Sequence, residues 1–416
     1  MRPVYLDNNA TTRVDDAVVT AMLPYFGDRF GNASSTHAFG AEVGDAVKVA
    51  RRKLQELIGA ALDGEIVFTS GGTESDNGAV LSAIETQGGR DEIVTTSVEH
   101  PAILTLVEHL AKARGTKTHL IGVDRHGRLD IDAYARALGP RTAIASVMWA
   151  NNETGTIFPV ELLAKMAHRV GALFHTDAVQ AVGKIPIDLK TTEIDMLSLS
   201  GHKLHGPKGI GALFIRKGVK FSPLIRGGHQ ERRRRGGTEN VPGIVGLGKA
   251  AELVIANLAG EQSRVRALRD RLERGILARI DHCVVNGDGD SRLPNTTNIA
   301  FDHLEGEAIL IHLDRAGVAA STGSACTAGS SEPSHVLCAM NVPRAALRGA
   351  IRLSLSREST EEQVDRVLEV LPGIIAKLRD LSPAWLNHEG KAERAEPYAR
   401  RLTPGNERTA DKGMRR

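Results

Sequence analysis

Two glycines in the sequence TSGGTESDN mark a possible anion site. Gly71 and Gly72 follow an apolar run and precede a helical pattern, so the backbone can approach a ligand closely there. The first N–H groups of a helix, here around Thr73 and Glu74, have no partner within the helix and favour an anion such as phosphate. A Gly-Gly turn before a helix is also often purely structural, and this turn alone leaves both interpretations open.

An acid and an amine follow at the ends of two later apolar runs. Asp177 lies in FHTDAVQ, and Lys203 lies 26 residues further on, in SGHKLHGPKG. In open α/β sheets, ligands bind at the carboxyl ends of the strands. Asp177 could pair with a pyridinium nitrogen, or it could form a helix capping box with Gln180. Lys203 could be a solvated surface charge, or a partly buried amine whose pKa is low enough to form a Schiff base.

A single cysteine stands in a segment of small residues. Apart from Cys326, all residues from Ser321 to Ser331 are Gly, Ala, Ser or Thr, which predicts an exposed and mobile loop. Free cysteines are usually buried, so packing explains Cys326 poorly and a reactive thiolate explains it better. Cys283 and Cys338 have apolar neighbours, and we predict that both are inert core residues.

The segments that must position these residues alternate between apolar runs and helical patterns. The runs are EIVFTS, EIVTTS, TAIASVMWA, ALFHTDA, IDMLSLS and GALFIR, and the helical patterns include AEVGDAVKVARRKLQELIG and PVELLAKMAHRVG. Buried strands that alternate with helices predict an α/β fold with a mainly parallel sheet. We expect one large domain over residues 14–255.

The pattern changes after about residue 256. A charged amphipathic helix, EQSRVRALRDRLERGILARI, leads to shorter strands, to the helix EGEAILIHLDRAG and to a last helix near Thr360, which has capping-box spacing with Gln363. We expect residues 1–13 and 256–380 to form a smaller α+β domain. Residues 387–416 are polar without an apolar period and are predicted to be a disordered tail.

Composition excludes several classes of function. The chain has 416 residues, of which 41% are hydrophobic and 25% charged, as in a soluble globular enzyme. No membrane span of about 20 apolar residues and no signal peptide are seen, so a cytoplasmic location is expected. Three cysteines are too few for a disulfide framework or a four-thiolate metal site, and no resident metal is expected. The net charge of +3 originates in the tail, so we expect no nucleic-acid partner.

The order of these motifs resembles the transferases of fold type I that depend on pyridoxal 5'-phosphate (PLP), and among them the cysteine desulfurases of the NifS/IscS family. The blocks that carry the resemblance run in family order from residue 7 to about 357. They are DNNATT, SVEHPA, NNETG, HTDAVQ, SGHKLHGPKG, GGHQERRRRGGTEN, GSACTAGSSEPSHV and IRLSLSR. The resemblance implies a large domain with a mainly parallel sheet of the seven-stranded type, PLP as cofactor and L-cysteine as substrate.

The resemblance also assigns cofactor roles to residues of these blocks. Lys203 would hold PLP as a Schiff base and shuttle protons. His100 would stack on the pyridine ring, although it could also simply end a strand. Asp177 would pair with the ring nitrogen and Gln180 with the phenolic oxygen. The remaining cofactor residues would be Gly72, Asn152 and, at the phosphate, Thr73, Ser200 and His202.

Two further roles concern the partner subunit and the substrate. Thr238 would reach the phosphate bound by a partner subunit, so the resemblance implies a homodimer, and we favour an interface role for the basic run Arg232–Arg235. Asn152 and Arg352 would bind the substrate carboxylate, with Asn9 near the substrate, because a planar guanidinium suits bidentate carboxylate binding. Arg352 could alternatively pair with a structural acid.

Cys326 would attack the substrate sulfur and carry it as a persulfide, leaving alanine. The catalytic set would therefore be Cys326, Lys203 and His100. The implied acceptor is an iron–sulfur scaffold protein of the NifU/IscU kind, and Cys326 could transiently ligate a cluster. The motifs look closest to the nitrogen-fixation branch, NifS, although Ser331 stands where the family has a bulky apolar residue.

Two alternatives remain open at this point. A selenocysteine lyase or another PLP enzyme of the same fold would share most of these motifs. A non-enzymatic sulfur or iron–sulfur carrier belongs to a different class, and it would leave Lys203 and Asp177 without a purpose.

Overall fold

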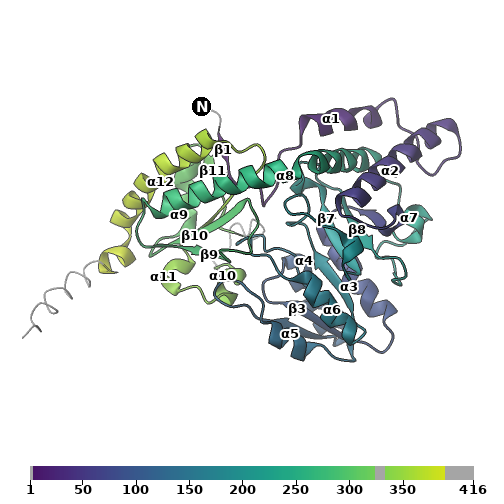
Figure 1. Cartoon of the computed structure of the whole chain (residues 1–416), viewed down its shortest axis with the longest axis horizontal. Coiled ribbons are helices and arrows are strands. Elements are labelled where there is room, and N and C mark those ends of the chain that lie inside the picture. The colour runs from purple at the N-terminus through teal and green to yellow at the C-terminus, as the bar shows by residue number, and fades with distance from the viewer. Residues whose placement is uncertain (1–2, 324–332, 389–416) are drawn as a thin grey trace, which may run out of the picture.

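The computed structural model describes residues 3–323 and 333–388. A seven-stranded sheet in the order β2-β8-β7-β6-β5-β3-β4 forms the centre of its larger part (Figure 1). The strands β3 to β7 are mutually parallel, and β8 is antiparallel to both β2 and β7, which confirms the mainly parallel sheet. The strands are β2 (Ile66–Thr69), β3 (Glu92–Thr96), β4 (Lys117–Ile121), β5 (Thr142–Ser146), β6 (Leu173–Asp177), β7 (Met196–Ser200) and β8 (Gly211–Ile215).

Six of these strands match the predicted apolar runs, and the edge strand β4 was not predicted. Only Ile121 of β4 is buried, so the sequence KTHLI lacks the continuous apolar run of the inner strands. It lies at one edge of the sheet, where only one neighbouring strand pairs with it.

Helices cover both faces of the large sheet. Successive residues of β7 point to opposite faces, so Met196 packs with Val80 and Ile103 on one side, and Leu197 packs with Leu54 on the other. The first side is covered by α3 and α4, and the second by α2 and α6. The bounds are α2 (Ala38–Leu57), α3 (Gly72–Thr86), α4 (Pro101–Arg114), α5 (Ile131–Ala137) and α6 (Val160–Arg169).

A smaller unit has its own apolar cluster, which includes Leu6, Ile299, Leu353 and Leu371. It contains an antiparallel sheet in the order β12-β10-β9 and a parallel pair, β1 with β11. The last helix begins at the predicted capping box, in which Thr360 and Gln363 exchange hydrogen bonds of 3.3 Å. The elements are β1 (Val4–Tyr5), β9 (Cys283–Asn286), β10 (Thr296–Phe301), α9 (Gly306–Arg315), β11 (Val318–Ala319), β12 (Ala350–Ser354) and α12 (Glu361–Leu381).

One long helix, α8 (Val241–Leu277), runs through both parts (Figure 1). Its residues up to Ala251 pack in the cluster of the large sheet, and its residues from Val265 onward pack in the cluster of the smaller unit. The border expected at residues 255 and 256 therefore falls inside a continuous helix. Among the described helices, α8 alone is long and apolar enough to cross a membrane by length and composition, and half of that window is buried in the protein.

The remaining elements are short. They are α1 (Asp16–Met22), α7 (Gln230–Arg233), α10 (His335–Ala339), α11 (Arg344–Leu347) and the 3-10 helices η1 (Leu23–Phe26), η2 (Asp63–Glu65), η3 (Leu189–Thr191) and η4 (Gly201–Lys203). The predicted tail from residue 387 lies almost entirely outside the described residues.

Candidate active site

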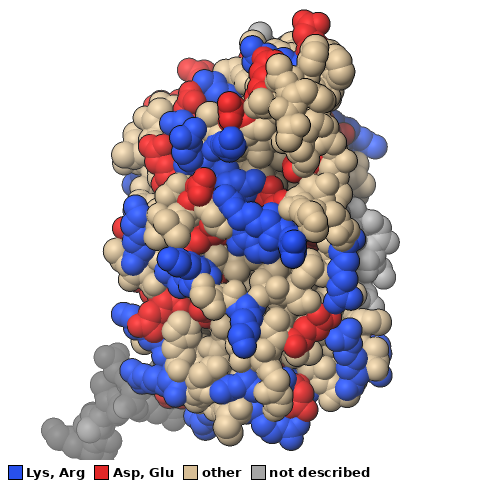
Figure 2. Space-filling view, turned by 90° about the vertical axis from the view of Figure 1, so that its right-hand side faces the viewer, with Lys and Arg blue, Asp and Glu red and all other residues tan. Residues whose placement is uncertain are grey.

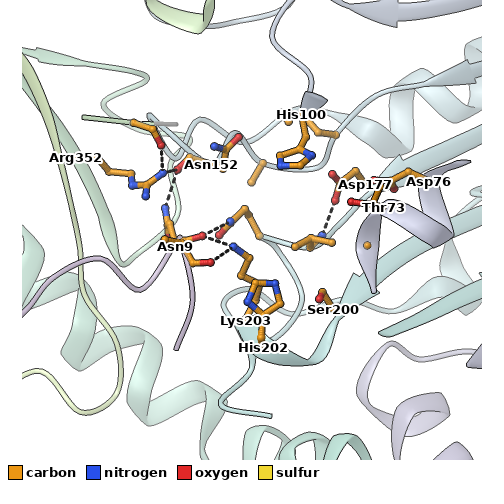
Figure 3. A pocket seen from close by; sticks show the side chains of 17 residues that line it. Asn9, Thr73, Asp76, His100, Asn152, Asp177, Ser200, His202, Lys203 and Arg352 are labelled. Carbon is orange, nitrogen blue, oxygen red and sulfur yellow. Dashed lines mark hydrogen bonds between the residues drawn. The ribbon is translucent and has the colours of Figure 1, made fainter. Parts of the chain in front are cut away.

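A cavity of about 260 Å³ opens at the carboxyl ends of the parallel strands. Figure 3 shows Asn9, Asn152 and Arg352 on one side of it, Thr73 and Asp177 on the other, and Lys203 between them. Most residues that the sequence singled out for cofactor and substrate line this cavity. They are Asn9, Gly72, Thr73, His100, Asn152, Asp177, Gln180, Ser200, His202, Lys203 and Arg352.

Two predicted residues are not placed there. Thr238 is exposed, lies in the segment before α8 and does not line the cavity of its own chain. Cys326 lies outside the described residues, as does most of its predicted loop.

The anion turn has the predicted form. Gly71 is the N-cap of α3, and Thr73 is in the first turn of that helix at the cavity wall. A Cβ at Gly72 would lie 2.8 Å from a methyl group of Val179, so this position must remain small. Free N–H groups at a helix start favour a phosphate. Ser200, at the end of β7, lines the cavity as well.

His202 adds a neutral hydrogen-bonding group to the side of the cavity that holds the anion turn. Burial, and then the positive charge of Lys203, lower the pKa of His202 to about 4, so the imidazole is neutral at pH 7. Its Nδ1 lies 3.1 Å from the hydroxyl of Thr11, which belongs to the DNNATT block. An added dianion would favour a proton on this ring, because an opposite charge stabilises the charged form.

Asp177 ends β6 inside the cavity, as predicted. Its Oδ1 accepts the N–H of Val179 at 2.9 Å. Residues 179–184 form turns, so the alternative of a helix capping box with Gln180 is wrong. Burial raises the pKa of the Asp177 carboxyl, and the neighbouring His100 and Lys203 oppose that rise. A positively charged ligand atom at this position would stabilise its ionised form.

His100 is fixed in a neutral form beside this acid. It is the N-cap of α4, and its Nδ1 accepts the N–H of Ala102 at 3.1 Å. Burial lowers the pKa of His100, although the charge of Asp177 acts against it. The alternative of a purely strand-ending residue thus describes only its backbone, since the ring lines the cavity.

Sequence analysis missed a second acid in the cavity, Asp76. It lies one helical turn after Gly72 on α3, and this i, i+4 spacing could have revealed that both face the same side. Its Oδ1 is buried and has no hydrogen-bond partner among the described residues. Burial, and then the charge of Asp177, raise the pKa of Asp76 well above its usual range. Two buried carboxyl groups therefore share this end of the cavity.

Lys203 reaches the cavity from the turn η4. Its Nζ donates to the backbone oxygens of Asn9 and of Ala10, the latter at 2.7 Å. The same segment is held in place by Thr12, whose N–H donates to the backbone oxygen of His202 at 2.9 Å. The amine is therefore oriented by the DNNATT segment, and it is not a solvated surface charge.

The opposite end of the cavity is built around a buried guanidinium. Arg352 on β12 is 1% exposed, and its Nη2 donates to Oδ1 of Asp7 at 2.7 Å. Its Nη1 donates to the backbone oxygens of Asn152, at 3.0 Å, and of Gly323. Asn9 donates to the same oxygen of Asn152 at 3.1 Å. Arg352 thus forms the structural ion pair of the alternative interpretation, and it also lines the cavity.

The expectation for the two other cysteines was wrong in part. Cys283 is half-buried, and its thiol lies 3.0 Å from the backbone oxygen of Ile280. Cys338 is exposed. Val336 and Leu337 of α10 are buried, but the next residue of the helix is rotated by about 100° and faces solvent. Apolar neighbours in sequence do not imply a shared face in a helix.

Comparison with known proteins identifies the relatives of this chain. The aminotransferase class-V family matches residues 4–367. The chain therefore belongs to the class-V aminotransferase family. A cysteine desulfurase of Gluconacetobacter diazotrophicus is 70% identical over 92% of this chain and 96% of that protein, and the cysteine desulfurase NifS of Azotobacter vinelandii is 58% identical with the same coverage. Within the family, the chain falls among these desulfurases.

Solved structures agree with this assignment. A NifS-like protein superposes with a TM-score of 0.85 at 38% identity, covering 90% of this chain and 100% of that one. A second structure, described as SspA in complex with cysteine, gives a TM-score of 0.75 at 33% identity over 86% of this chain and 100% of that chain. The predicted fold type is confirmed, and the chain is an enzyme.

Proposed function

We propose that the protein is a cysteine desulfurase that binds PLP, removes sulfur from L-cysteine and holds it as a persulfide on Cys326. One observation carries the proposal: an anion turn, a buried acid, an oriented amine and a buried guanidinium line a single cavity. The relatives named cysteine desulfurase support the same reaction. Release of alanine, rather than pyruvate or a transaminated product, would distinguish it from other enzymes of this fold.

The residues of the cavity fit PLP. Asp76 Oδ1 is buried without a hydrogen bond in the described part of the chain, 3.6 Å from Nε2 of the neutral His175, and burial raises the pKa of Asp177 beside it. A protonated ring nitrogen supplies the positive charge that buried acids require. When bound, PLP supplies an electron-withdrawing ring that makes the substrate sulfur electrophilic. Its phosphate would be held by Thr73, Ser200 and His202.

The other residues have matching tasks in the reaction. Lys203 would hold the cofactor and carry a proton on Nζ, positioned by the backbone oxygens of Asn9 and Ala10. The neutral ring of His100 would cover one face of the cofactor. Arg352 would receive the substrate carboxylate, because its fork of donors matches two carboxylate oxygens.

The sulfur transfer itself requires a thiolate, which we assign to Cys326. Its sulfur would form a bond with the substrate sulfur while the carbon–sulfur bond of the substrate breaks. The substrate carbon keeps that electron pair, gains a proton and leaves as alanine. The acceptor of the persulfide sulfur would be an iron–sulfur scaffold protein in the cytoplasm, and the NifS relatives favour nitrogenase maturation as the destination.

We further propose that the enzyme is a homodimer. Four large apolar side chains near α1 and α2 are strongly exposed, at 57 to 73% (Leu23, Phe26, Phe30 and Phe39). Figure 2 shows Lys and Arg side chains gathered across the middle of one face of the molecule. The exposed Arg232 and Arg233 of α7 lie close to the exposed Thr238 in sequence. If a partner subunit covers these surfaces, Thr238 of this chain would lie near the cavity of the partner.

The test of this proposal is the variant Lys203→Ala beside Lys208→Ala, which changes an exposed lysine five residues further on. Lys203→Ala is expected to form no detectable alanine from cysteine and to lose the visible-edge absorbance of bound PLP. Lys208→Ala is expected to keep both. Normal turnover by Lys203→Ala would remove the PLP assignment.

The thiol is tested with the same assay. Cys326→Ala is expected to bind PLP and cysteine, with the spectral change that substrate causes, but to release little sulfide. Cys283→Ala and Cys338→Ala are expected to release sulfide at the normal rate. Equal rates in all three variants would contradict the assignment of Cys326.

A further inference from the structure

Lys184 is a partly buried amine that the reaction as described does not use. It lies at the end of the turns that follow β6, and its Nζ donates to Oε1 of Gln180 at 2.6 Å. Burial, and then the positive charges of Lys203 and Arg352, lower the pKa of Lys184 well below its usual range. A lysine placed at such a cost needs a compensating role, since desolvation disfavours its charged form.

The contact determines which way the amide of Gln180 points. The Nζ of Lys184 donates to the amide oxygen, so this oxygen faces the lysine. The amide nitrogen of Gln180 is then turned away, and it donates to the backbone oxygen of Asn9 at 3.0 Å. Lys184 and the backbone oxygen of Asn9 thus favour the same orientation of the amide from its two ends.

This chain of contacts ends at the reacting amine. The backbone oxygen of Asn9 that accepts from Gln180 also accepts from Lys203 Nζ. Gln180 and Lys203 both line the main cavity, whereas Lys184 lines a second, smaller cavity behind it. Lys184 therefore acts on the site through Gln180.

The second cavity is also lined by the other charged and titratable groups near Lys184. Besides Lys203, they are His205, Glu261 and Arg357. Burial, and then the charge of Arg357, lower the pKa of His205 to about 4, so this imidazole is neutral at pH 7. Glu261 is the one acid among the described side chains that line this cavity.

We propose that Lys184 is a positioning residue that fixes the amide of Gln180 so that the N–H not bonded to Asn9 points toward the cavity, where it donates to the phenolic oxygen of PLP. The inference rests on the proposed function, because it needs PLP in this cavity. A donor at that oxygen favours its ionised form, and therefore lowers the pH at which the visible absorbance of the bound cofactor changes.

The test is a double-mutant cycle on the cofactor-loaded protein. Lys184→Met, Gln180→Ala and the double variant are titrated, and the pH midpoint of the visible absorbance is measured. Lys184→Met is expected to raise the midpoint by about one pH unit, and the double variant to shift no further than Gln180→Ala alone. Lys184→Arg keeps donors at this position, and its midpoint is expected to lie close to that of the unmodified protein.

Lys190→Met is the matched control, because it removes an exposed lysine of the same segment. It is expected to titrate like the unmodified protein. An unchanged midpoint in Lys184→Met overturns the inference, and so do shifts that add in the double variant, since they would show a direct effect of the charge. If the unmodified protein takes up no PLP, the proposed function fails, and the inference fails with it.

Discussion

The two ends of the cavity are assembled in different ways. At the cofactor end, Asp177 and Ser200 end neighbouring strands of one sheet, and Lys203 lies in the turn that follows. At the substrate end, Asn9 meets Asn152 from 143 residues away, and Arg352 meets it from 200 residues away. One end depends on a single sheet, and the other depends on how the smaller unit packs against that sheet.

The two ends also differ in how their charges are balanced. The acids of the cofactor end, Asp177 and Asp76, have a raised pKa because burial deprives them of solvent. The guanidinium of the substrate end already has Asp7 and two backbone oxygens as partners. A cationic ligand would therefore stabilise the ionised acids of the cofactor end. At the substrate end, a substrate carboxylate would have to replace some of the contacts that Arg352 already makes.

The largest effect is expected from breaking the substrate end. Arg352→Gln removes two charge-assisted contacts to a carboxylate, each worth about 1.5 to 3 kcal/mol, so kcat/KM for cysteine should fall roughly 10²- to 10⁴-fold. The loss should appear mainly as a higher KM, measured from alanine formation. The cofactor absorbance should remain, because Arg352 belongs to the other end.

Arg292→Gln is the matched control for this variant. Arg292 is equally buried and pairs with Glu273 at 2.8 Å, but it does not line the cavity. Both variants should lose about 1 to 3 kcal/mol of stability, because each leaves a partly buried acid without its arginine partner. A similar rise of KM in both would show general loosening and would contradict a substrate role. Arg352→Lys keeps the charge without the fork and serves if Arg352→Gln does not fold.

A smaller effect is expected from a buried acid behind the cofactor end. Glu99 accepts hydrogen bonds from Thr96, at 2.7 Å, and from the N–H of Met148, at 3.0 Å. Burial nevertheless raises its pKa to about 8. Since the folded pKa exceeds the unfolded one, this group's stability contribution is complete below about pH 4.5 and is lost as the pH rises to about 8.

Glu99→Gln should remove this pH dependence. Relative to the unmodified protein, the free energy of unfolding of the variant should rise by on the order of 3 kcal/mol between pH 5 and pH 8.5. Urea unfolding of the cofactor-loaded protein across that range measures the difference. Parallel curves for the two proteins would show that Glu99 is ionised in the folded state throughout.

The same contrast explains what the sequence could predict. Asp177 and Lys203 of the cofactor end were recognisable because apolar runs end at or shortly before them, and these patterns are local. The roles at the substrate end came from a family resemblance. The contact of Arg352 with Asp7 depends on the packing of distant segments, which no local pattern encodes.

The residues that prediction missed share one property: their roles depend on three-dimensional neighbours. Asp76 and Lys184 are charged residues in ordinary surroundings of the sequence, and only the fold shows that Asp76 is buried and that Lys184 reaches the amide of Gln180. For Cys338 the prediction was wrong in the opposite sense: the residue is exposed, because its apolar neighbours occupy the other face of a short helix. The fold class needed only hydrophobic patterns, whereas these side chains needed the packing.

The smallest effect is expected from Thr238, which tests whether the cofactor end is completed by a second subunit. Thr238 is exposed and does not line the cavity of its own chain. Loss of one hydrogen bond to a phosphate should weaken PLP binding roughly tenfold in Thr238→Ala, measured by the release of cofactor on dilution. Unchanged affinity in a protein shown to be dimeric would refute the contact.

A mixed dimer decides between a contact within one chain and a contact across the interface. One subunit carries Thr238→Ala and the other carries Lys203→Ala, with different tags for purification. If Thr238 serves the partner's cavity, the intact Lys203 lies in a site completed by the intact Thr238, and that site should bind PLP with normal affinity. If Thr238 serves its own chain, the same site keeps the weakened affinity. The cofactor end would then depend on its own subunit alone, as the substrate end does in the described contacts of Arg352.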